Sequence, residues 1–249
     1  KIDITVPGDI QITSSNNYIL VKNVVQLEDY IACVSIAEMS YLCPIEFLKA
    51  QTIAARSWIL AGTEKKHLDL GIDVCNDDCC QRYQGINKKN NKSYNAIKET
   101  LGIVLTHKNK ICDARYSKSC GGITENCENV WEMEPKPYLK SIFDGNFKYK
   151  KTNLINWYLN PVYAYCSDKF NSYDLTSKYL GNVDIKEQYF RWKVKFTMDE
   201  FCNLLSLKLK LNISKVENFQ VLNRGISGRI IRLNILYKTE NNTTKMIQL

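Results

Sequence analysis

The stretch Leu27–Ser57, LEDYIACVSIAEMSYLCPIEFLKAQTIAARS, decides the fold of the N-terminal part of the chain. Its first half predicts a helix over about residues 27–37, ending near Glu38, because its residues recur at helical spacing. After a break in this pattern, Pro44 suits the first turn of a second helix, which we expect to stop at Gly62. The positions that define the two helix faces are Leu27, Tyr30, Ile31 and Val34, then Leu48, Thr52, Ala55 and Ile59.

On either side of this stretch, the pattern predicts short strands and further helices. Residues 1–25 are β-like, and 92–101 are typical of a helix followed by a hairpin of strands 102–107 and 110–117. Residues 189–196 alternate as a strand. Further expected elements are a capping box at Thr197–Glu200, a short helix through Leu205, and paired strands at 215–222 and 229–237. The fold class is therefore α+β, with mixed helices and antiparallel strands.

Length and composition indicate a globular protein with a basic surface. The chain has 249 residues, 45% hydrophobic and 24% charged, which is enough for one large domain or two small ones. Its net charge of +8 favours an anionic partner: nucleic acid, a membrane or a cell-wall polymer. We expect no nucleic-acid partner, because the lysines are scattered rather than gathered in a recognised fold. We also expect a mature fragment without its signal or anchor, because the chain starts abruptly at Lys1 and has no membrane-length apolar run.

Histidine is scarce, and this limits the possible chemistry. Only His67 and His107 are present, so a Ser-His-Asp or Cys-His mechanism must use one of these two rings. The ten cysteines are many, but a chain of this length does not need disulfides to fold. The polar segment 63–92 contains three of them, and we expect it to be a long ordered loop with a function.

Four blocks of sequence stand out, in order along the chain. They are Glu38-Met39 with Pro44-x-x-x-Leu48-Lys49-Ala50-Gln51-x-x-Ala54-Ala55-Arg56-Ser57, Asp73-Val74-Cys75 to Cys80-Gln81-x-Tyr83-x-Gly85, Tyr116-x-x-x-Cys120-Gly121-Gly122-x-Thr124-Glu125 with Val130-Trp131 and Pro137-Tyr138-Leu139, and Arg224-Gly225-x-Ser227-Gly228-Arg229. Together they resemble the stage II sporulation protein D family, also called the amidase-enhancer family. The order of the four blocks makes the resemblance specific, and it extends from about residue 10 to 240.

The resemblance implies an enzyme of cell-wall remodelling. Such a protein is a lytic transglycosylase, a lyase that cuts the MurNAc–GlcNAc bond of peptide-stripped peptidoglycan strands and leaves 1,6-anhydro-MurNAc ends. It is extracytoplasmic, associated with the cell wall or membrane, and works with a cell-wall amidase, as in engulfment during sporulation. We therefore expect one catalytic region over residues 1–249, with lobes at 1–145 and 146–249 around a glycan-binding cleft.

Glu38 is the residue that the resemblance makes catalytic. A hydrolase of the usual kind needs two carboxylates, whereas a lytic transglycosylase needs one, because the C6 hydroxyl of the sugar replaces water. Glu38 would protonate the glycosidic oxygen as general acid and then, as base, take the C6 hydroxyl proton. The first step requires that Glu38 hold its proton near neutral pH, which we expect from desolvation. From position alone, a glutamate at a helix end is more often a solvated surface residue.

Gln51, Arg56, Tyr116 and Ser119 are the candidate substrate-binding residues. Glutamine can hydrogen-bond sugar hydroxyls or the N-acetyl group, and arginine can bind a lactyl carboxylate. Because Gln51 and Arg56 are five residues apart, at most one of them faces the substrate, and Arg56 is as readily a bridge to another loop. Tyr116 and Ser119 approach Gly121-Gly122, where a sugar can come close to the backbone. Tyr116 is otherwise an ordinary strand aromatic.

His67, Cys75 and Cys80 are candidate ligands of a structural zinc ion, the one cofactor that we consider. Some family members carry a similar cysteine pair with a histidine between, and Cys79 occupies the place of that histidine here. Two thiolates and His67 suit zinc, with a fourth ligand from Cys79, an aspartate or water. The alternatives are free thiols or a Cys75–Cys80 disulfide, which a location outside the membrane would permit.

Two other functions stay open from the sequence. A cell-wall cysteine peptidase would use Cys120 with His67 or His107 and would release new amino termini. A non-catalytic module would bind wall polymer and enhance an amidase, with or without Glu38. The chemistry of the products distinguishes these functions from a lytic transglycosylase.

Overall fold

The chain folds as two compact units. The N-terminal unit comprises Lys1–Lys118 and Ser172–Glu187, and the C-terminal unit comprises Ser119–Asn171 and Gln188–Leu249. The chain therefore passes from one unit to the other after Lys118, whereas the sequence suggests lobes that meet at 145/146. The computed structural model describes residues 4–15, 18–63, 66–86, 91–131, 133–146, 163–180 and 189–249. That all 249 residues form one catalytic region stays a prediction.

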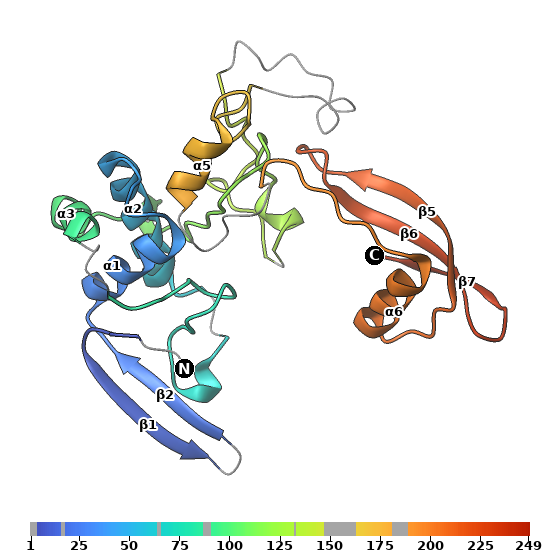
Figure 1. Ribbon diagram of the computed structural model, residues 1–249, viewed down its shortest axis with the longest axis horizontal. Helices are drawn as coiled ribbons and strands as arrows, with labels where there is room; N and C mark the ends of the chain where they lie inside the picture. The colour runs from blue at the N-terminus through green and yellow to red at the C-terminus, as the bar shows by residue number, and fades with distance from the viewer. Residues whose placement is uncertain are drawn as a thin grey trace. The chain divides into compact units, whose positions relative to one another are not determined.

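Three helices form the core of the N-terminal unit (Figure 1). They are α1 (Leu27–Glu38), α2 (Ile45–Ala61) and α3 (Asn91–Glu99), and they pack against one another. All three confirm the helices predicted from periodicity, and α2 ends at Gly62, whose φ of 56° is left-handed. The buried apolar side chains that the helices share are Tyr30, Ile31, Ala32, Val34, Ala55 and Ile97.

A short helix from later in the chain completes this unit. α5 (Tyr173–Leu180) lies in a region where the sequence predicts no element. The Tyr179 carbonyl accepts hydrogen bonds from the Ser40 N–H at 2.9 Å and from the Cys43 thiol at 3.3 Å. These bonds hold the turn between α1 and α2. Among the helices described, none is both long and apolar enough to cross a membrane.

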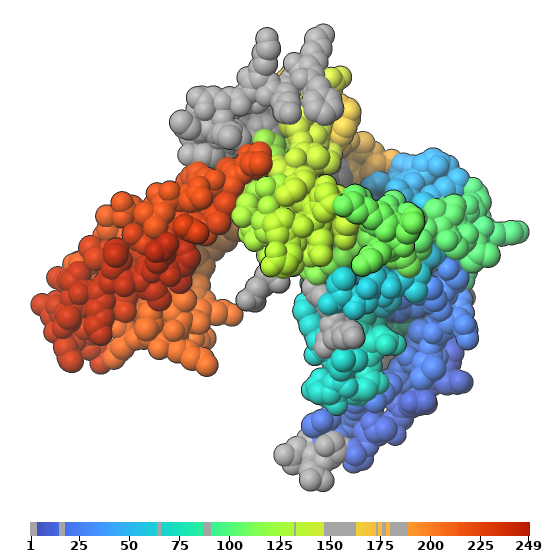
Figure 2. All heavy atoms as spheres, turned by 180° about the vertical axis from the view of Figure 1, so that it is seen from behind, coloured from blue at the N-terminus to red at the C-terminus, as the bar shows by residue number. Residues whose placement is uncertain are grey.

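A β-hairpin and a long loop lie beside the helices. β1 (Asp9–Ser15) pairs antiparallel with β2 (Tyr18–Val24), which confirms part of the β-like start of the sequence. The loop over residues 66–86, which includes the short helix η1 (Leu68–Leu70), packs against this hairpin, as Figure 2 shows in teal and blue. Lys22 donates a hydrogen bond to the Gly71 carbonyl, and the Tyr83 hydroxyl donates a 2.6 Å bond to Asn23 Oδ1. Ile86 also forms a bridge with Thr5, which precedes β1.

The predicted hairpin around His107 is confirmed but short. β3 (Thr106–His107) pairs antiparallel with β4 (Lys110–Ile111). Lys108 and Asn109 form the turn with φ values of 49° and 60°, the left-handed conformation that a two-residue turn of this kind requires. The flanking residues, which the sequence assigns to longer strands, lie outside regular strands.

The C-terminal unit is built on a three-stranded antiparallel sheet with the order β5-β6-β7. Its strands are β5 (Lys215–Arg224), β6 (Ile230–Lys238) and β7 (Thr244–Gln248), and α6 (Met198–Leu209) packs on β5 (Figure 1). The first two strands and the helix confirm the sequence, including the capping box between Thr197 and Glu200. The sequence pattern does not predict β7, because this strand is short and largely exposed and shows little alternation. The buried core consists of Cys202, Ile213, Val216, Ile235 and Tyr237.

The strand predicted over 189–196 is wrong. These residues form no strand, and no described strand pairs with them. Trp192, Val194 and Phe196, which give the segment its alternating pattern, are 76%, 57% and 51% exposed. Alternation predicts a strand only where one face is buried and a neighbouring strand satisfies the backbone, and this segment has neither.

Glu125 ties two distant parts of the C-terminal unit together. Its Oε2 accepts hydrogen bonds from the Ser227 hydroxyl at 2.5 Å and from the Ser227 N–H at 3.1 Å. Its Oε1 accepts from the Asn126 N–H and from the Asn129 amide, both at 3.0 Å. A Cβ at Gly225 would lie 2.1 Å from Oε2, so the carboxylate requires glycine there. Asn129 belongs to the short helix η2 (Cys127–Asn129).

The Glu125 contacts make the stability of this unit depend on pH. Burial alone would raise the pKa of Glu125, but the hydrogen bonds from Ser227 and Asn129 outweigh burial and lower that pKa below its usual range. A depressed folded-state pKa contributes stability above the unfolded pKa of about 4.3, and this stability is lost as the pH falls through the folded value.

We predict that Glu125→Gln lowers the free energy of unfolding by about 2 kcal/mol at pH 7 and by less at about pH 3, below the unfolded pKa, where the wild type has lost part of this contribution. Urea unfolding at both pH values measures the difference. The control is Glu217→Gln, which removes a partly exposed ion pair with Lys238 and changes the free energy of unfolding by less than about 1 kcal/mol. An effect of Glu125→Gln that is the same at both pH values would contradict this account.

Candidate functional site

Glu38 stands at the last turn of α1, where it is half-buried. Its Oε1 accepts a 2.9 Å hydrogen bond from the backbone N–H of Arg82, a residue of the long loop. The next residue, Met39, leaves the helix with an extended backbone and is buried. The carboxylate is therefore held in one orientation at the junction of a helix end and the loop, and it does not point freely into solvent.

Gln81 anchors the loop that supplies this donor. The side chain is 1% exposed, and its Oε1 accepts a 2.9 Å hydrogen bond from the Tyr30 hydroxyl. Its Nε2 donates to the Tyr116 hydroxyl at 3.1 Å and to the Ala55 carbonyl at 3.4 Å. A single amide thus joins α1, α2, the loop and the segment after the β3–β4 hairpin. Because Arg82 is next in sequence, the same anchor fixes the N–H that meets Glu38.

Tyr116, one of the candidate residues, lies beside Glu38, and Gln51 lies beside Tyr116. Burial raises the pKa of Tyr116 far above its usual range, and the nearby Glu38 charge raises it further. Contacts with Gln81 and Gln51 lower the pKa of the same Tyr116 hydroxyl. Gln51 is 6% exposed, and its Nε2 has no hydrogen-bond partner of normal geometry in the described part of the chain. A buried amide donor with this unmet capacity is costly unless a ligand or water satisfies it.

Arg56 makes a different set of contacts. It is 1% exposed, and its guanidinium donates to both Glu28 carboxylate oxygens, at 2.8 and 2.6 Å, and to the Ile103 carbonyl at 3.0 Å. This is the bridging role that the sequence leaves as the alternative to substrate binding. A buried arginine held by two hydrogen bonds to one carboxylate stabilises the packing of α1 on α2 and on the segment after α3.

Ser119 belongs to the C-terminal unit rather than to the group around Glu38. Its hydroxyl accepts a 3.4 Å hydrogen bond from the Gly121 N–H and also contacts the Cys166 thiol. A role for Ser119 in binding glycan stays a prediction.

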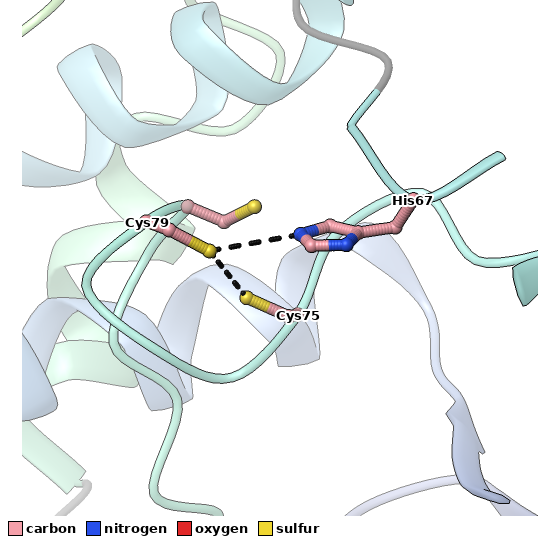
Figure 3. A group of neighbouring side chains, drawn as sticks. His67, Cys75 and Cys79 are labelled. Atoms are coloured by element: carbon pink, nitrogen blue, oxygen red, sulfur yellow. Dashed lines mark hydrogen bonds between the residues drawn. The ribbon is translucent and has the colours of Figure 1, made fainter. Parts of the chain in front are cut away.

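The long loop gathers His67, Cys75, Cys79 and Cys80 into one group of possible metal ligands (Figure 3). One ligand atom from each lies within 4.8 Å of the others. The Cys79 sulfur is 3.6 Å from His67 Nε2, which agrees with the edge of about 3.6 Å of a tetrahedral zinc site. The Cys75–Cys79 sulfur separation of 3.0 Å is shorter than the sulfur–sulfur edge of about 3.8 Å. We call these four residues the loop cluster.

The loop cluster lies within electrostatic reach of the group around Glu38. Tyr30 shows this, because burial raises its pKa and the charges of Tyr116, Cys80 and Glu38 each raise it further. Inside the cluster, the hydrogen bond with Cys75 raises the pKa of Cys79 to about 12. The donor set of one imidazole and three thiols is typical of zinc.

The fold and the site together define an α+β domain with a half-buried carboxylate at a helix end and a cysteine-histidine group close to it. Residues 15–107 match the family described as Stage II sporulation protein, so this region of the chain is a domain of that family. Residues 125–248 match a domain of unknown function, DUF8618. The family match contains Glu38 and the loop cluster, and it ends before Tyr116 and Ser119.

Three curated proteins are similar to the chain. An uncharacterized protein of Brachyspira hyodysenteriae is 33% identical over 54% of the chain and 36% of its own length. An amidase enhancer of Bacillus subtilis is 35% identical over 41% of the chain and 13% of its own length. Stage II sporulation protein D of Bacillus subtilis is 30% identical over 47% of the chain and 38% of its own length. The chain spans less than half the length of each of these relatives.

The sequence reasoning missed Tyr30, Gln81 and the Arg82 N–H. Gln81 stands inside the second quoted block, directly after Cys80, so its position in a motif was visible. Its role was not visible, because a glutamine in a polar loop gives no sign of burial and its partners lie 26 to 51 residues away.

We predict that Gln81→Ala lowers the free energy of unfolding by about 2–4 kcal/mol, because it removes three hydrogen bonds and leaves buried hydroxyls unpaired. Hydrogen exchange of the Arg82 amide should become faster, since the anchor next to it is lost. The matched control is Gln84→Ala, an exposed glutamine of the same loop, with an expected change below about 0.5 kcal/mol. Equal effects of the two substitutions would refute the anchoring role of Gln81.

Proposed function

We propose that the chain is the catalytic part of a peptidoglycan lytic transglycosylase with Glu38 as its acid and base. The observation that carries the proposal is the position of Glu38: half-buried, oriented by the Arg82 N–H and next to Tyr116, within a Stage II sporulation protein domain. The four-block resemblance supports the substrate, peptide-stripped glycan strands cut at the MurNAc–GlcNAc bond. It also supports an extracytoplasmic place, associated with the wall or membrane, in remodelling such as sporulation engulfment.

The proposed reaction needs one carboxyl group used twice. Glu38 gives its proton to the glycosidic oxygen as the bond to C1 of MurNAc breaks, and the GlcNAc end leaves as an alcohol. The Glu38 carboxylate then accepts the proton of the C6 hydroxyl, whose oxygen bonds to C1 and closes the 1,6-anhydro ring. No water is consumed, and Glu38 ends in its starting protonation state. This requires a protonated Glu38 in the resting enzyme, which stays a prediction.

Gln51 is the residue best suited to bind the sugar. Its buried Nε2 is without a partner among the described residues, and it lies close to Tyr116 beside the catalytic carboxylate. An amide donor of this kind can bond an N-acetyl or hydroxyl oxygen of the glycan. The Tyr116 hydroxyl, held by Gln81, would orient the same part of the substrate. A glycan-binding cleft around these residues stays a prediction, as does the amidase partner.

We predict that Glu38→Gln keeps the fold and reduces release of anhydro-muropeptide-type sugars from stripped glycan by at least about 100-fold, because it removes the proton donor. Mass spectrometry of the released sugars measures this, and circular dichroism checks the fold. The control is Glu46→Gln on α2, whose side chain is 77% exposed and which should release sugars at the wild-type rate.

Each alternative function gives a different product. Unchanged glycan binding and no cleavage by the wild type would favour the non-catalytic enhancer. New amino termini would favour a cysteine peptidase, but the described contacts of the Cys120 sulfur are Asp144, Cys166 and the Gly122 N–H, not a histidine. Full sugar release by Glu38→Gln would end the assignment of Glu38.

We further propose that the loop cluster holds a structural zinc ion through His67, Cys75, Cys80 and Cys79. The donor set and the Cys79–His67 distance support zinc, and the bound metal would fix the loop that leads to Gln81 and Arg82. Zinc would take no part in the reaction of Glu38. It would have a structural role, because its bonds to the four ligands would cross-link a polar loop.

We predict that Cys75→Ser lowers the zinc content of the purified protein by roughly one ion per chain, since serine does not replace a thiolate ligand. Hydrogen exchange of the Arg82 amide should also become faster. The control is Cys112→Ser, which changes a cysteine outside the cluster and should leave the zinc content as it is. Unchanged zinc in Cys75→Ser would disprove a metal at this cluster.

A further inference from the structure

A second group of thiols lies in the C-terminal unit, apart from the loop cluster. Cys120, Asp144 and Cys166 place one ligand atom each within 4.8 Å of the others, and all three are half-buried. We call them the C-terminal cluster. The backbone brings them together, because Asp144 N–H donates to the Gly122 carbonyl at 2.8 Å and Tyr165 N–H donates to the Asp144 carbonyl at 2.8 Å. Three separate segments of chain therefore meet at these side chains.

The separations in the C-terminal cluster fit the edges of a tetrahedral zinc site. The Cys120 and Cys166 sulfurs are 3.7 Å apart, and zinc–sulfur bonds of about 2.3 Å give a tetrahedral edge of about 3.8 Å. The Cys120 sulfur is 3.4 Å from Asp144 Oδ2, and the corresponding sulfur–oxygen edge is about 3.5 Å. A disulfide would need the two sulfurs at about 2.05 Å.

Backbone and side-chain donors surround this group of side chains. The Gly122 N–H donates to the Cys120 sulfur at 3.3 Å, and Gly122 reaches this position with a φ of 98°, a conformation that favours glycine. Backbone donors to sulfur of this kind are part of the outer shell that tunes metal–thiolate sites. The Arg191 guanidinium donates to the Gly121 carbonyl at 2.9 Å, which places a positive charge beside the turn that carries Cys120.

We propose that the C-terminal cluster is a second metal site, in which Cys120, Cys166 and Asp144 bind Zn²⁺. Binding releases the two thiol protons to solvent, and the Cys120–Asp144 hydrogen bond is replaced by two metal–ligand bonds. The three ligands carry three negative charges and the ion two positive ones, and Arg191 balances the remaining negative charge. Two thiolates select zinc over magnesium or calcium, which prefer oxygen ligands. Three protein ligands leave the fourth position for water.

The site would fasten the Gly121–Gly122 turn to the segments around Asp144 and Cys166. Ile123 bridges to Phe143 and Gly145 bridges to Ala164, so the ligands stand next to isolated backbone bridges rather than to a full sheet. Such isolated bridges contribute little stability by themselves, and a metal cross-link between them would add stability that the small local core around Ala164 lacks.

The test separates this site from the loop cluster by removing the loop cluster first. In the full chain carrying Cys75→Ser, Cys79→Ser and Cys80→Ser, we expect roughly one zinc ion per chain by elemental analysis. Cobalt(II) should bind there with thiolate-to-metal charge-transfer absorption. Adding Cys166→Ser or Asp144→Asn should weaken cobalt binding at least about 100-fold, more than loss of an outer partner costs. The matched control is Cys202→Ala, which changes a cysteine in the core of the same unit and should leave cobalt binding unchanged.

Two results would overturn the proposal. One is a metal-free protein whose intact mass shows a Cys120–Cys166 disulfide, and the other is cobalt binding that survives Cys166→Ser unchanged. If the triple variant does not fold, the wild-type chain decides: Cys166→Ser should lower its zinc content by roughly one ion, and an unchanged content would refute the site. These outcomes do not depend on the activity of Glu38 or on zinc in the loop cluster.

Discussion

The buried amide of Gln81 is the interaction on which the candidate site depends. A polar side chain that is 1% exposed is tolerated only when its hydrogen bonds are satisfied, and Gln81 satisfies them with Tyr30, Tyr116 and Ala55. Each partner belongs to a different segment, so the amide can form its bonds only when the helices and the loop are in register. The Arg82 N–H then has one possible position, and the Glu38 carboxylate meets it there. The orientation of the carboxylate is thus a consequence of the packing of the loop.

This dependence gives the loop cluster a physical reason to be where it is. Val74 and Tyr83 of the loop over residues 66–86 pack against the core of the helices, but most of the loop is polar, so ordering it costs conformational entropy. His67 and Cys80 stand near the two ends of the stretch that must be fixed before Gln81. A cross-link between them shortens the free loop and lowers the entropy lost when Gln81 enters the core. A metal cross-link at the loop cluster would therefore help to orient the Glu38 carboxylate, because both act through the same loop.

The sequence predicted what local patterns determine and missed what distant partners determine. Helical spacing sufficed for α1 and α2 and placed Glu38 at a helix end, since periodicity depends on neighbours three and four residues away. The same spacing separated Gln51 from Arg56, which do contact different partners. The Glu28 partner of Arg56 and the buried role of Gln81 depend on residues at least 26 positions away, which no local pattern encodes. For residues 189–196 the local pattern misled the prediction. Their alternation predicts a strand, but no partner strand for it exists in the described structure.

The block around Gly121-Gly122 acquires a different meaning once its contacts are known. The resemblance suggests that paired glycines admit a sugar, whereas in the structure Gly122 brings its N–H to the Cys120 sulfur and Glu125 binds the Ser227 loop. Arg229 extends the same connection, donating to the Cys120 carbonyl at 2.7 Å and the Ile123 carbonyl at 3.0 Å. From Cys120 onward, the third block is thus bonded to the fourth block within the C-terminal unit. It follows that the reaction proposed for Glu38 draws on the first two blocks and on Tyr116, whereas the described contacts of Gly122, Glu125 and Arg229 stabilise the C-terminal unit.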